Sequence, residues 1–206
     1  MVKLVYDARV KRFRYPEGSF ASAAAVQYQT EKFLKTKQSE LVMLANRLAN
    51  DPLNVTLQKE VASTLKDIHI TAGALAAGGS NNLYANDYLV LARGLKRQYG
   101  LTDNDPQEYG LKYLYQDIAT GYTSESQLTN RLKMYANSSK TAYNEIERVK
   151  KKDAGFTEGL RQLAFGEHCK ECQLYSSFGW VGIDKLILPT MGCSCLTNCK
   201  CTIIYR

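Results

Sequence analysis

The sequence predicts a mainly α-helical fold, a helical bundle followed by a small, β-rich module at the C-terminal end. Three observations lead to this prediction. Over most of residues 22–165, apolar residues recur at spacings of three, four and seven, the period of an amphipathic helix. All six cysteines lie between residues 169 and 201. Between them, β-branched and aromatic residues alternate with glycine and proline, which is typical of short strands and turns.

These patterns divide the chain into three parts. Residues 1–21 are expected to form a basic, extended N-terminal arm, residues 22–165 an α-helical body, and residues 166–206 a cysteine-rich module. The 206 residues are enough for one such body and a small appendix. Since no stretch approaches about eighteen consecutive apolar residues, we expect a soluble, globular protein without a membrane-spanning helix.

Two long helices are expected to open the body. The first covers residues 22–50, and its apolar stripe is separated by Lys, Glu and Gln. In the turn that follows, Asp51 is expected to cap the second helix and Pro52 to take its first position. This helix ends near Gly78 in a run of small residues, so that either a neighbour packs closely there or the helix frays. Its apolar stripe consists of Leu57, Val61, Leu65, Ile68 and Ala72.

Three further helices complete the predicted body. The third covers about residues 86–99, and the fourth starts at an Asx cap with a first-turn proline in residues 105–108. The fifth begins with a capping box formed by Ser124 and Gln127 and runs to about residue 152. The core stripe of the fourth helix is Leu111, Leu114 and Ile118. The residues expected on or near the buried face of the fifth are Leu128, Leu132, Tyr135, Tyr143, Ile146 and Val149.

The formal net charge of +7 suggests an acidic partner, either nucleic acid or an acidic protein surface. Positive charge is concentrated in two places. One is the end of the fifth helix, residues 148–152, where cations suit the helix macrodipole. The other is the arm, whose cations are Lys3, Arg9, Lys11, Arg12 and Arg14. Because no aromatic platform is interleaved with them, the arm alone is a weak sign of nucleic-acid binding.

The cysteines have the spacing of a metal site. A Cys-x-x-Cys pair at residues 169–172 is followed by Cys-x-Cys-x-x-x-Cys-x-Cys at residues 193–201. Thiolates are soft ligands that zinc prefers, and closely spaced pairs let a short segment close a tetrahedral site. The N-terminus shows no apolar run of signal-peptide length, so we expect synthesis in a reducing cytoplasm and metal-bound thiols rather than disulfides. The module is therefore predicted to be zinc-knuckle-like, with a structural Zn²⁺.

More candidate ligands are present than one structural zinc needs. The expected ligands are Cys169, Cys172, Cys195 and Cys199, and the next candidate is Cys201. Cys193 and His168 are expected to be bystanders. A two-metal cluster stays open, but it would need bridging thiolates. A catalytic zinc is disfavoured, because open zinc sites usually combine His or carboxylate ligands with a nearby general base.

Enzymatic chemistry has few candidates elsewhere. Neither a G-x-S-x-G elbow nor a phosphate-binding glycine loop occurs in the sequence. One of the two histidines, His69, falls within a helical stripe and is expected to be a packed helix residue. We therefore expect that the protein is not an enzyme and that it has no small-molecule substrate.

The cysteine module resembles a known family. His-Cys-x-x-Cys from His168, Gly179-Trp180, Leu188-Pro-x-x-Gly192 and Asn198-Cys-Lys-Cys201, with a closing apolar strand, are similar to the C-terminal signature of tailed-bacteriophage minor head proteins, also called head-morphogenesis proteins. The helical segment from about residue 90 onward is similar to the one that precedes the module in that family. The sequence departs from the family pattern at Lys200, where arginine is usual, and at Cys193, an additional thiol.

The resemblance carries over to individual cysteines. Cys169 and Cys172 match the first pair of the family, and Cys199 and Cys201 match its closing pair. Cys195 falls where the family has another Cys or a His. The resemblance implies a structural virion protein without catalytic activity. Such a protein is made in the cytoplasm of the host bacterium and built into the head or the portal–neck region.

The implied partners are other head proteins, the major capsid protein or the portal protein or both, with several copies of this chain. The basic arm could also contact packaged DNA. A different class of function stays open, a zinc-containing nucleic-acid-binding protein that uses the basic arm against phosphates. Salt-sensitive retention on DNA would favour this alternative, whereas co-sedimentation with heads would favour the virion protein.

Overall fold

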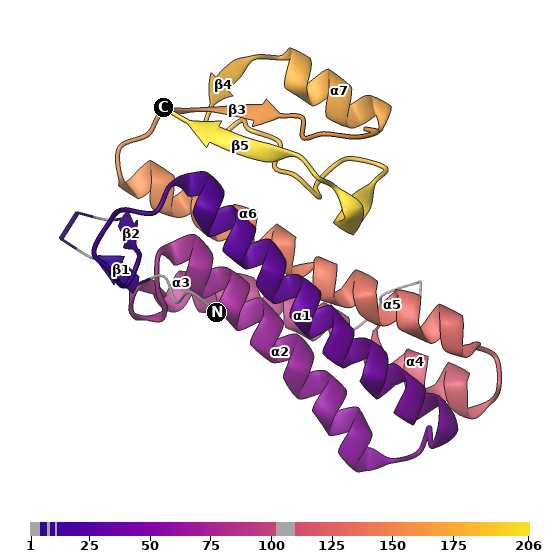
Figure 1. Ribbon diagram of the computed structural model, residues 1–206. Coiled ribbons are helices and arrows are strands. Elements are labelled where there is room, and N and C mark those ends of the chain that lie inside the picture. Colours follow the sequence, from indigo (N-terminus) through magenta and orange to yellow (C-terminus); the bar gives the residue numbers. More distant parts are fainter. Residues whose placement is uncertain (1–4, 8, 11, 102–109) are drawn as a thin grey trace.

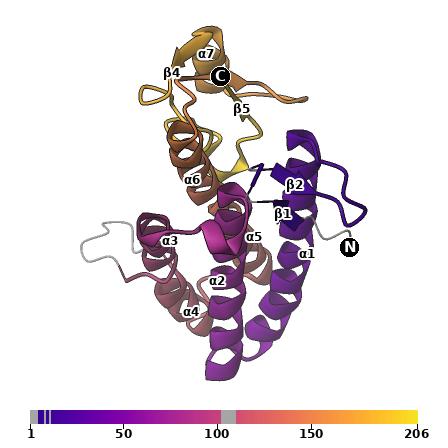
Figure 2. The ribbon, with the colours of Figure 1, turned by 90° about the vertical axis from the view of Figure 1, so that its left-hand side faces the viewer.

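The computed structural model describes residues 5–7, 9–10, 12–101 and 110–206. It consists of a helical body with a small module of strands and one helix at one end, and the two perpendicular views place this module beside α6 (Figures 1 and 2). The predicted fold class, a helical bundle with a small β-containing C-terminal module, is confirmed. Across the described ranges, no helix is both long enough and apolar enough to cross a membrane.

A long helical hairpin opens the body. Helix α1 (Ala23–Asn50) begins at Ser22, whose hydroxyl accepts a hydrogen bond from the backbone N–H of Ala25 at 3.1 Å. Helix α2 (Val55–Ala77) is capped by Asn54 and not by Asp51, because Asp51 ends α1 and a two-residue turn with Pro52 has to follow it. The predicted ends of both helices are otherwise close to the observed ones.

The main apolar core lies between α1, α2, α4 (Leu111–Ala119) and α5 (Glu125–Asn137). The predicted stripes of α2 and α4 are buried as expected, and so are Leu128, Leu132 and Tyr135 of α5. The predicted start of the fourth helix, residues 105–108, lies outside the described residues. Just before α4, Gly110 has φ +119°, and a Cβ there would lie 2.3 Å from the backbone nitrogen of Gly100, so the close crossing of these two segments requires glycine.

A second, smaller core joins the end of α2 to α3 (Ala85–Gln98) and α6 (Ser139–Asp153). The position of a Cβ on Gly73 lies 3.0 Å from Leu91 of α3 and 3.1 Å from Ile146 of α6. The small residues at this end of α2 are therefore explained by close packing. Gly78 then ends the helix with φ +79°, the left-handed conformation that glycine adopts readily.

The predicted fifth helix is wrong in one respect, because the chain forms two helices, α5 and α6, separated at Ser138. The hydroxyls of Ser138 and Ser139 each donate to a carbonyl three residues back, at 2.7 Å, and so compete with the regular helical pattern. The break lets α5 pack mainly against α1 and α6 mainly against α2. Val149 of α6, predicted near the buried face, is 42% exposed because the buried face of α6 runs through Ala142 and Ile146.

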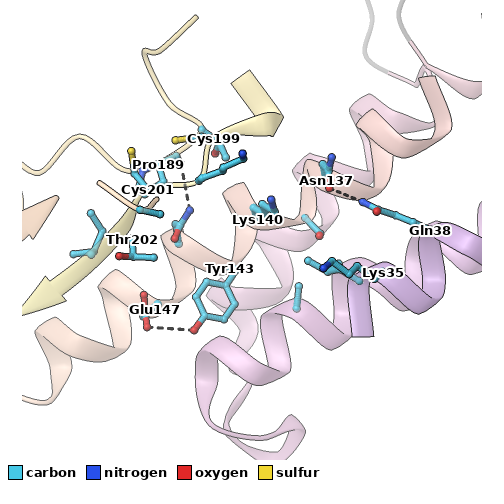
Figure 3. Close-up of a pocket in the computed structure, with 18 of the residues that line it drawn as sticks. Lys35, Gln38, Asn137, Lys140, Tyr143, Glu147, Pro189, Cys199, Cys201 and Thr202 are labelled. Atoms are coloured by element: carbon cyan, nitrogen blue, oxygen red, sulfur yellow. Dashed lines mark hydrogen bonds between the residues drawn. The ribbon is translucent and has the colours of Figure 1, made fainter. Parts of the chain in front are cut away.

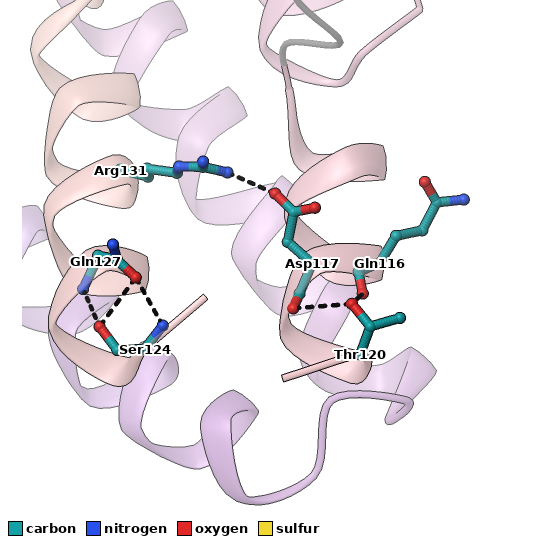
Figure 4. A network of polar contacts seen from close by, with 6 residues as sticks. All are labelled: Gln116, Asp117, Thr120, Ser124, Gln127 and Arg131. Atoms are coloured by element: carbon teal, nitrogen blue, oxygen red, sulfur yellow. Dashed lines mark hydrogen bonds and ion pairs between the residues drawn. The ribbon is translucent and has the colours of Figure 1, made fainter. Parts of the chain in front are cut away.

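Helices α4 and α5 are joined by a small polar network (Figure 4). The predicted capping box is confirmed: Ser124 Oγ accepts from the Gln127 N–H at 3.3 Å, and Gln127 Oε1 accepts from the Ser124 N–H at 2.9 Å. Arg131 of α5 donates to Asp117 of α4 at 2.8 Å. These contacts fix the turn between the two helices.

The N-terminal segment is a hairpin and not an open arm. Strands β1 (Val5–Asp7) and β2 (Arg12–Arg14) pair antiparallel, and the predicted turn before α1 returns the chain so that Arg14 bridges to Phe20. Arg14 pairs with Asp7 at 2.8 Å and lies 4.0 Å from the centre of the Phe20 ring. Lys3, Lys11 and the side chain of Arg12, which belong to the predicted basic arm, lie outside the described part.

The C-terminal module contains a three-stranded antiparallel sheet in the order β4-β3-β5. Its strands are β3 (Glu158–Gln162), β4 (Trp180–Gly182) and β5 (Thr202–Tyr205), and helix α7 (Lys170–Ser177) precedes β4. The closing strand was predicted. Strand β3 falls within residues assigned by sequence to the helical body, whereas the observed helices of the body end with α6 at Asp153.

Candidate metal centre

Three segments of the module bring the six cysteines together. Cys169 stands at the N-terminus of α7 and Cys172 one turn further, so both thiols lie on one side of the helix. The second segment carries Cys193 and Cys195, the latter at the start of the short 3₁₀ helix η2 (Leu196–Asn198). In the third segment, Cys199 ends η2 and Cys201 directly precedes β5. All six cysteines are free thiols.

Four of these thiols form one compact group. The Sγ atoms of Cys169, Cys172, Cys193 and Cys195 all lie within 4.8 Å of one another. Cys195 Sγ lies 3.7 Å from Cys169 Sγ, 3.5 Å from Cys172 Sγ and 3.4 Å from Cys193 Sγ. Disulfide sulfurs would lie about 2.05 Å apart. The observed spacing is therefore not that of disulfides, and it would allow these four thiols to bind one metal ion.

A second group of thiols shares one member with the first. The Sγ atoms of Cys172, Cys199 and Cys201 lie within 4.8 Å of one another, and Cys172 Sγ lies 3.7 Å from Cys199 Sγ. Cys172 thus belongs to both groups. It is completely buried, and Cys199 and Cys201 are nearly so.

The expected ligand set is divided between these two groups. Cys169, Cys172 and Cys195 fall in the first group, and Cys199 and Cys201 in the second. The additional thiol Cys193, expected to be a bystander, lies in the first group, whereas Cys199, expected to complete the set of four ligands, lies in the second. His168 lies at the edge of the second group, with its Nδ1 3.9 Å from Cys201 Sγ.

Arg161 is also part of this centre, although no motif in the sequence marks it. The side chain projects from β3 and is 1% exposed. Its Nη2 lies 3.2 Å from Cys172 Sγ, 3.3 Å from Cys199 Sγ and 3.5 Å from Cys193 Sγ. The other terminal nitrogen, Nη1, donates to the backbone carbonyls of residues 187 and 188. The sequence signal for Arg161 could only be an alternation of inward and outward residues along β3. This signal is weak, because the strand has five residues and polar residues, Glu158 and Gln162, at its two ends.

The thiols differ in how easily they lose a proton. Burial opposes charge on Cys169, but the backbone N–H groups of Cys172 and Cys195 outweigh it and lower the pKa of this thiol to about 7. Burial likewise opposes charge on Cys199, whose pKa falls to about 6 because backbone N–H groups and the Arg161 cation favour the thiolate. Burial raises the pKa of Cys172 and raises that of Cys195 to about 12. Hydrogen-bond donors around Cys169 and Cys199 thus favour the thiolate at these two positions.

The cysteine cluster could therefore bind a metal ion, since its thiols lie within ligand distance of one another. No family model, curated protein or solved structure matches this chain.

The module meets the body along a polar boundary. From α6, Thr141 Oγ1 lies 2.6 Å from Thr190 Oγ1, and Asn144 donates to the carbonyl of Pro189 at 3.3 Å. Further along α6, Lys152 pairs with Asp184 at 2.7 Å. These contacts hold the loop between β4 and the second cysteine segment against the helix.

A cleft of about 570 Å³ lies beside this boundary, between α1, α6 and the start of β5 (Figure 3). Its walls include Lys35 of α1, Tyr143 and Glu147 of α6, and Cys199 and Cys201 of the second thiol group. Tyr143 donates to Glu147 Oε1 at 3.3 Å, and burial raises the pKa of the Glu147 carboxyl. The second thiol group therefore borders this cleft through Cys199 and Cys201.

Proposed function

We propose that the C-terminal module is a structural zinc module. The observation that carries this proposal is the group of four thiols within 4.8 Å of one another. With Zn–S bonds of about 2.3 Å, the sulfurs of a tetrahedral site are about 3.8 Å apart. The Sγ–Sγ distances of 3.4 to 3.7 Å around Cys195 are close to that value. Among common metals, zinc combines a preference for tetrahedral geometry with affinity for thiolates.

The burial of Arg161 supports an anionic, metal-bound cluster. A guanidinium is always charged, and burying it is costly unless an anion compensates it. The carbonyls that Arg161 contacts are neutral, so the surrounding sulfurs are the groups that can supply negative charge. Cysteine sulfurs bound to a metal are thiolates, and N–H groups that donate to these sulfurs stabilise them.

The role of the metal would be to hold the module together. Apart from cysteine, the large apolar residues buried in the module are Ile183, Leu186 and Leu188, which is too few for an independent core. In small domains of this kind, the free energy of metal binding becomes free energy of folding. Zinc would thus compensate for the missing core.

For the whole chain, we propose a structural role in the head of a tailed phage, as the resemblance to minor head proteins implies. The supporting motifs are the cysteine pairs together with Gly179-Trp180, Leu188-Pro189 and Asn198. Several apolar side chains of the module face solvent, among them Phe165, which is fully exposed. A rigid module with exposed aromatic residues suits contact with neighbouring proteins in an assembly.

The described cations give less support to nucleic-acid binding through the arm. Arg14 pairs with Asp7 and stacks on Phe20, so this cation is already engaged within the hairpin. Arg9 is exposed. We therefore retain DNA binding as an outcome to be tested and not as the favoured function.

Metal content and thiol state test the zinc proposal. The full chain, purified under reducing conditions without added metal, should contain zinc by elemental mass spectrometry. After denaturation and alkylation, all six cysteines should carry the alkyl label. A metal-free protein with three disulfides would contradict the proposal.

Sedimentation tests the role of the whole chain. The chain should co-sediment with tailed-phage heads assembled in its presence and resist washing at high salt. If the chain instead stays unassembled and binds duplex DNA with an affinity that falls steeply with salt, the nucleic-acid function replaces the virion function.

A further inference from the structure

We infer that the module holds two metal ions, which share the thiolate of Cys172 as a bridging ligand. The inference rests on the proposed zinc function and deepens it. The two thiol groups converge on this one sulfur: Cys172 Sγ lies 3.5 Å from Cys195 Sγ in the first group and 3.7 Å from Cys199 Sγ in the second. A thiolate has lone pairs for two metals, and Cys172 is the completely buried centre of the cluster.

The number of donors fits two tetrahedral ions. The first site takes all four of its ligands from the first group of thiols. The second site has the thiolates of Cys172, Cys199 and Cys201, and needs one more donor. His168 supplies it, since its Nδ1 lies 3.9 Å from Cys201 Sγ. In a tetrahedral zinc site with one imidazole, the nitrogen and sulfur ligands are about 3.6 Å apart.

The orientation of His168 matches that of a metal ligand. Its Nε2 lies 2.6 Å from the carbonyl oxygen of Ala164. A carbonyl oxygen only accepts, so Nε2 carries the proton, and in the neutral imidazole Nδ1 then presents its lone pair. Ligating histidines usually donate their second nitrogen to a backbone carbonyl or carboxylate in this way. His168 Nδ1 is not among the atoms within 4.8 Å of the whole second group, so coordination of the second ion would require the ring to move toward these thiols.

Arg161 is placed to offset part of the negative charge of such a cluster. On binding, the six thiols release their protons, and six thiolates against two divalent cations leave two negative charges in excess. The Arg161 guanidinium neutralises one of them. Its Nη2 contacts Cys193 of the first site, Cys199 of the second and the shared Cys172. Because the Arg161 guanidinium donates to sulfurs of both groups, we expect thiolates in both.

Metal stoichiometry of the full chain tests this inference. The chain loaded with Zn²⁺ and freed of excess metal should carry two ions per molecule by native mass spectrometry. One ion per chain would overturn the two-metal inference and leave the zinc proposal intact. No bound ion would overturn both.

Cadmium NMR tests the bridge itself. With ¹¹³Cd²⁺ in place of zinc, the chain should give two ¹¹³Cd signals, and the β protons of Cys172 should correlate with both. If every cysteine correlates with one signal only, Cys172 is not shared and the inference fails.

Two variants test the fourth ligand of the second site. His168→Gln should keep the first ion and bind the second at least tenfold more weakly, judged by competition with a zinc chelator. Lys170→Gln, which changes a neighbouring residue without removing a ligand, should bind both ions as the unaltered chain does. If His168→Gln holds two ions with unchanged affinity, the assignment of His168 is overturned.

Discussion

The helical body and the C-terminal module are stabilised in different ways. In the body, the completely buried positions are filled by apolar side chains such as Leu48, Leu65 and Leu132. In the module, the buried interior consists largely of cysteine sulfurs around the charged side chain of Arg161. The body thus depends on removing apolar surface from water, whereas the module depends on its thiol cluster. The two regions should therefore respond to different perturbations.

The largest expected effect is that of metal removal on the module. Structural zinc contributes on the order of 10 kcal/mol in small metal-dependent domains. Adding a strong chelator should therefore abolish protection from hydrogen exchange in β3, α7 and β5, while α1 and α2 stay protected. The same chelator saturated with zinc is the control. Equal loss of protection in both regions would mean that they do not unfold separately.

A smaller effect, again confined to the module, is expected for Arg161→Met. This change leaves buried thiolates without their cation, and breaking a buried charge pair costs about 3–5 kcal/mol. Zinc should dissociate at lower chelator concentration. The matched control is Arg206→Met, since Arg206 is 57% exposed and its pair with Glu158 is worth at most about 1 kcal/mol. Similar chelator sensitivity of the two variants would argue against a role for Arg161 in the cluster.

The converse change is Leu132→Ala in the body. Removing this completely buried side chain should lower the free energy of unfolding of the body by about 2–5 kcal/mol. Thermal unfolding followed by the helical circular dichroism signal measures the loss, and the zinc content should not change. Leu89→Ala, at a position 62% exposed, is the control and should have little effect.

Acid should act on the body through His69. Burial lowers the pKa of this imidazole from 6.5 to about 4, so the unfolded chain binds a proton that the folded chain does not. Stability is fully present above pH 6.5 and is lost as the pH falls toward 4, by about 3 kcal/mol in total. Urea unfolding of the chelated protein at several pH values should show this loss. His69→Gln should flatten the dependence.

The smallest effect is expected for Ser124→Ala at the start of α5. Losing the capping hydroxyl should cost about 1 kcal/mol, because the N–H of Gln127 loses its partner. The body should unfold at a slightly lower temperature with unchanged zinc content. Ser126→Ala, in the exposed first turn of the same helix, is the control.

Much of the body could be predicted from the sequence because helical periodicity is a local signal. The stripe from Leu57 to Ala72 and the capping box of Ser124 both appear as predicted. The break at Ser138 could not be predicted, because it depends on which neighbour each half of the helix packs against. The exposure of Val149 follows from the same packing.

The cysteine spacing located the candidate site but not the grouping of its ligands. Spacing shows that Cys169 and Cys172 share one side of a helix, since this is local geometry. Whether the Sγ atom of Cys193 or that of Cys199 lies beside these two thiols depends on the path of the chain through residues 193–199, which include η2. No local sequence pattern predicts that path. Arg161 reaches the cluster from β3, eight residues before the first cysteine, and only the fold reveals it.

The break at Ser138 gives α6 a direction of its own, so that this helix links the body to the module. Helix α6 has fifteen residues and is about 22 Å long, and its length bears the hydrogen bonds that hold the module. A rotation of about 10° at Ser138 would displace the far end of the helix by about 4 Å. Ser138 Oγ also lies 3.3 Å from Nε2 of the buried His69, so the point at which α6 takes its own direction is packed inside the body.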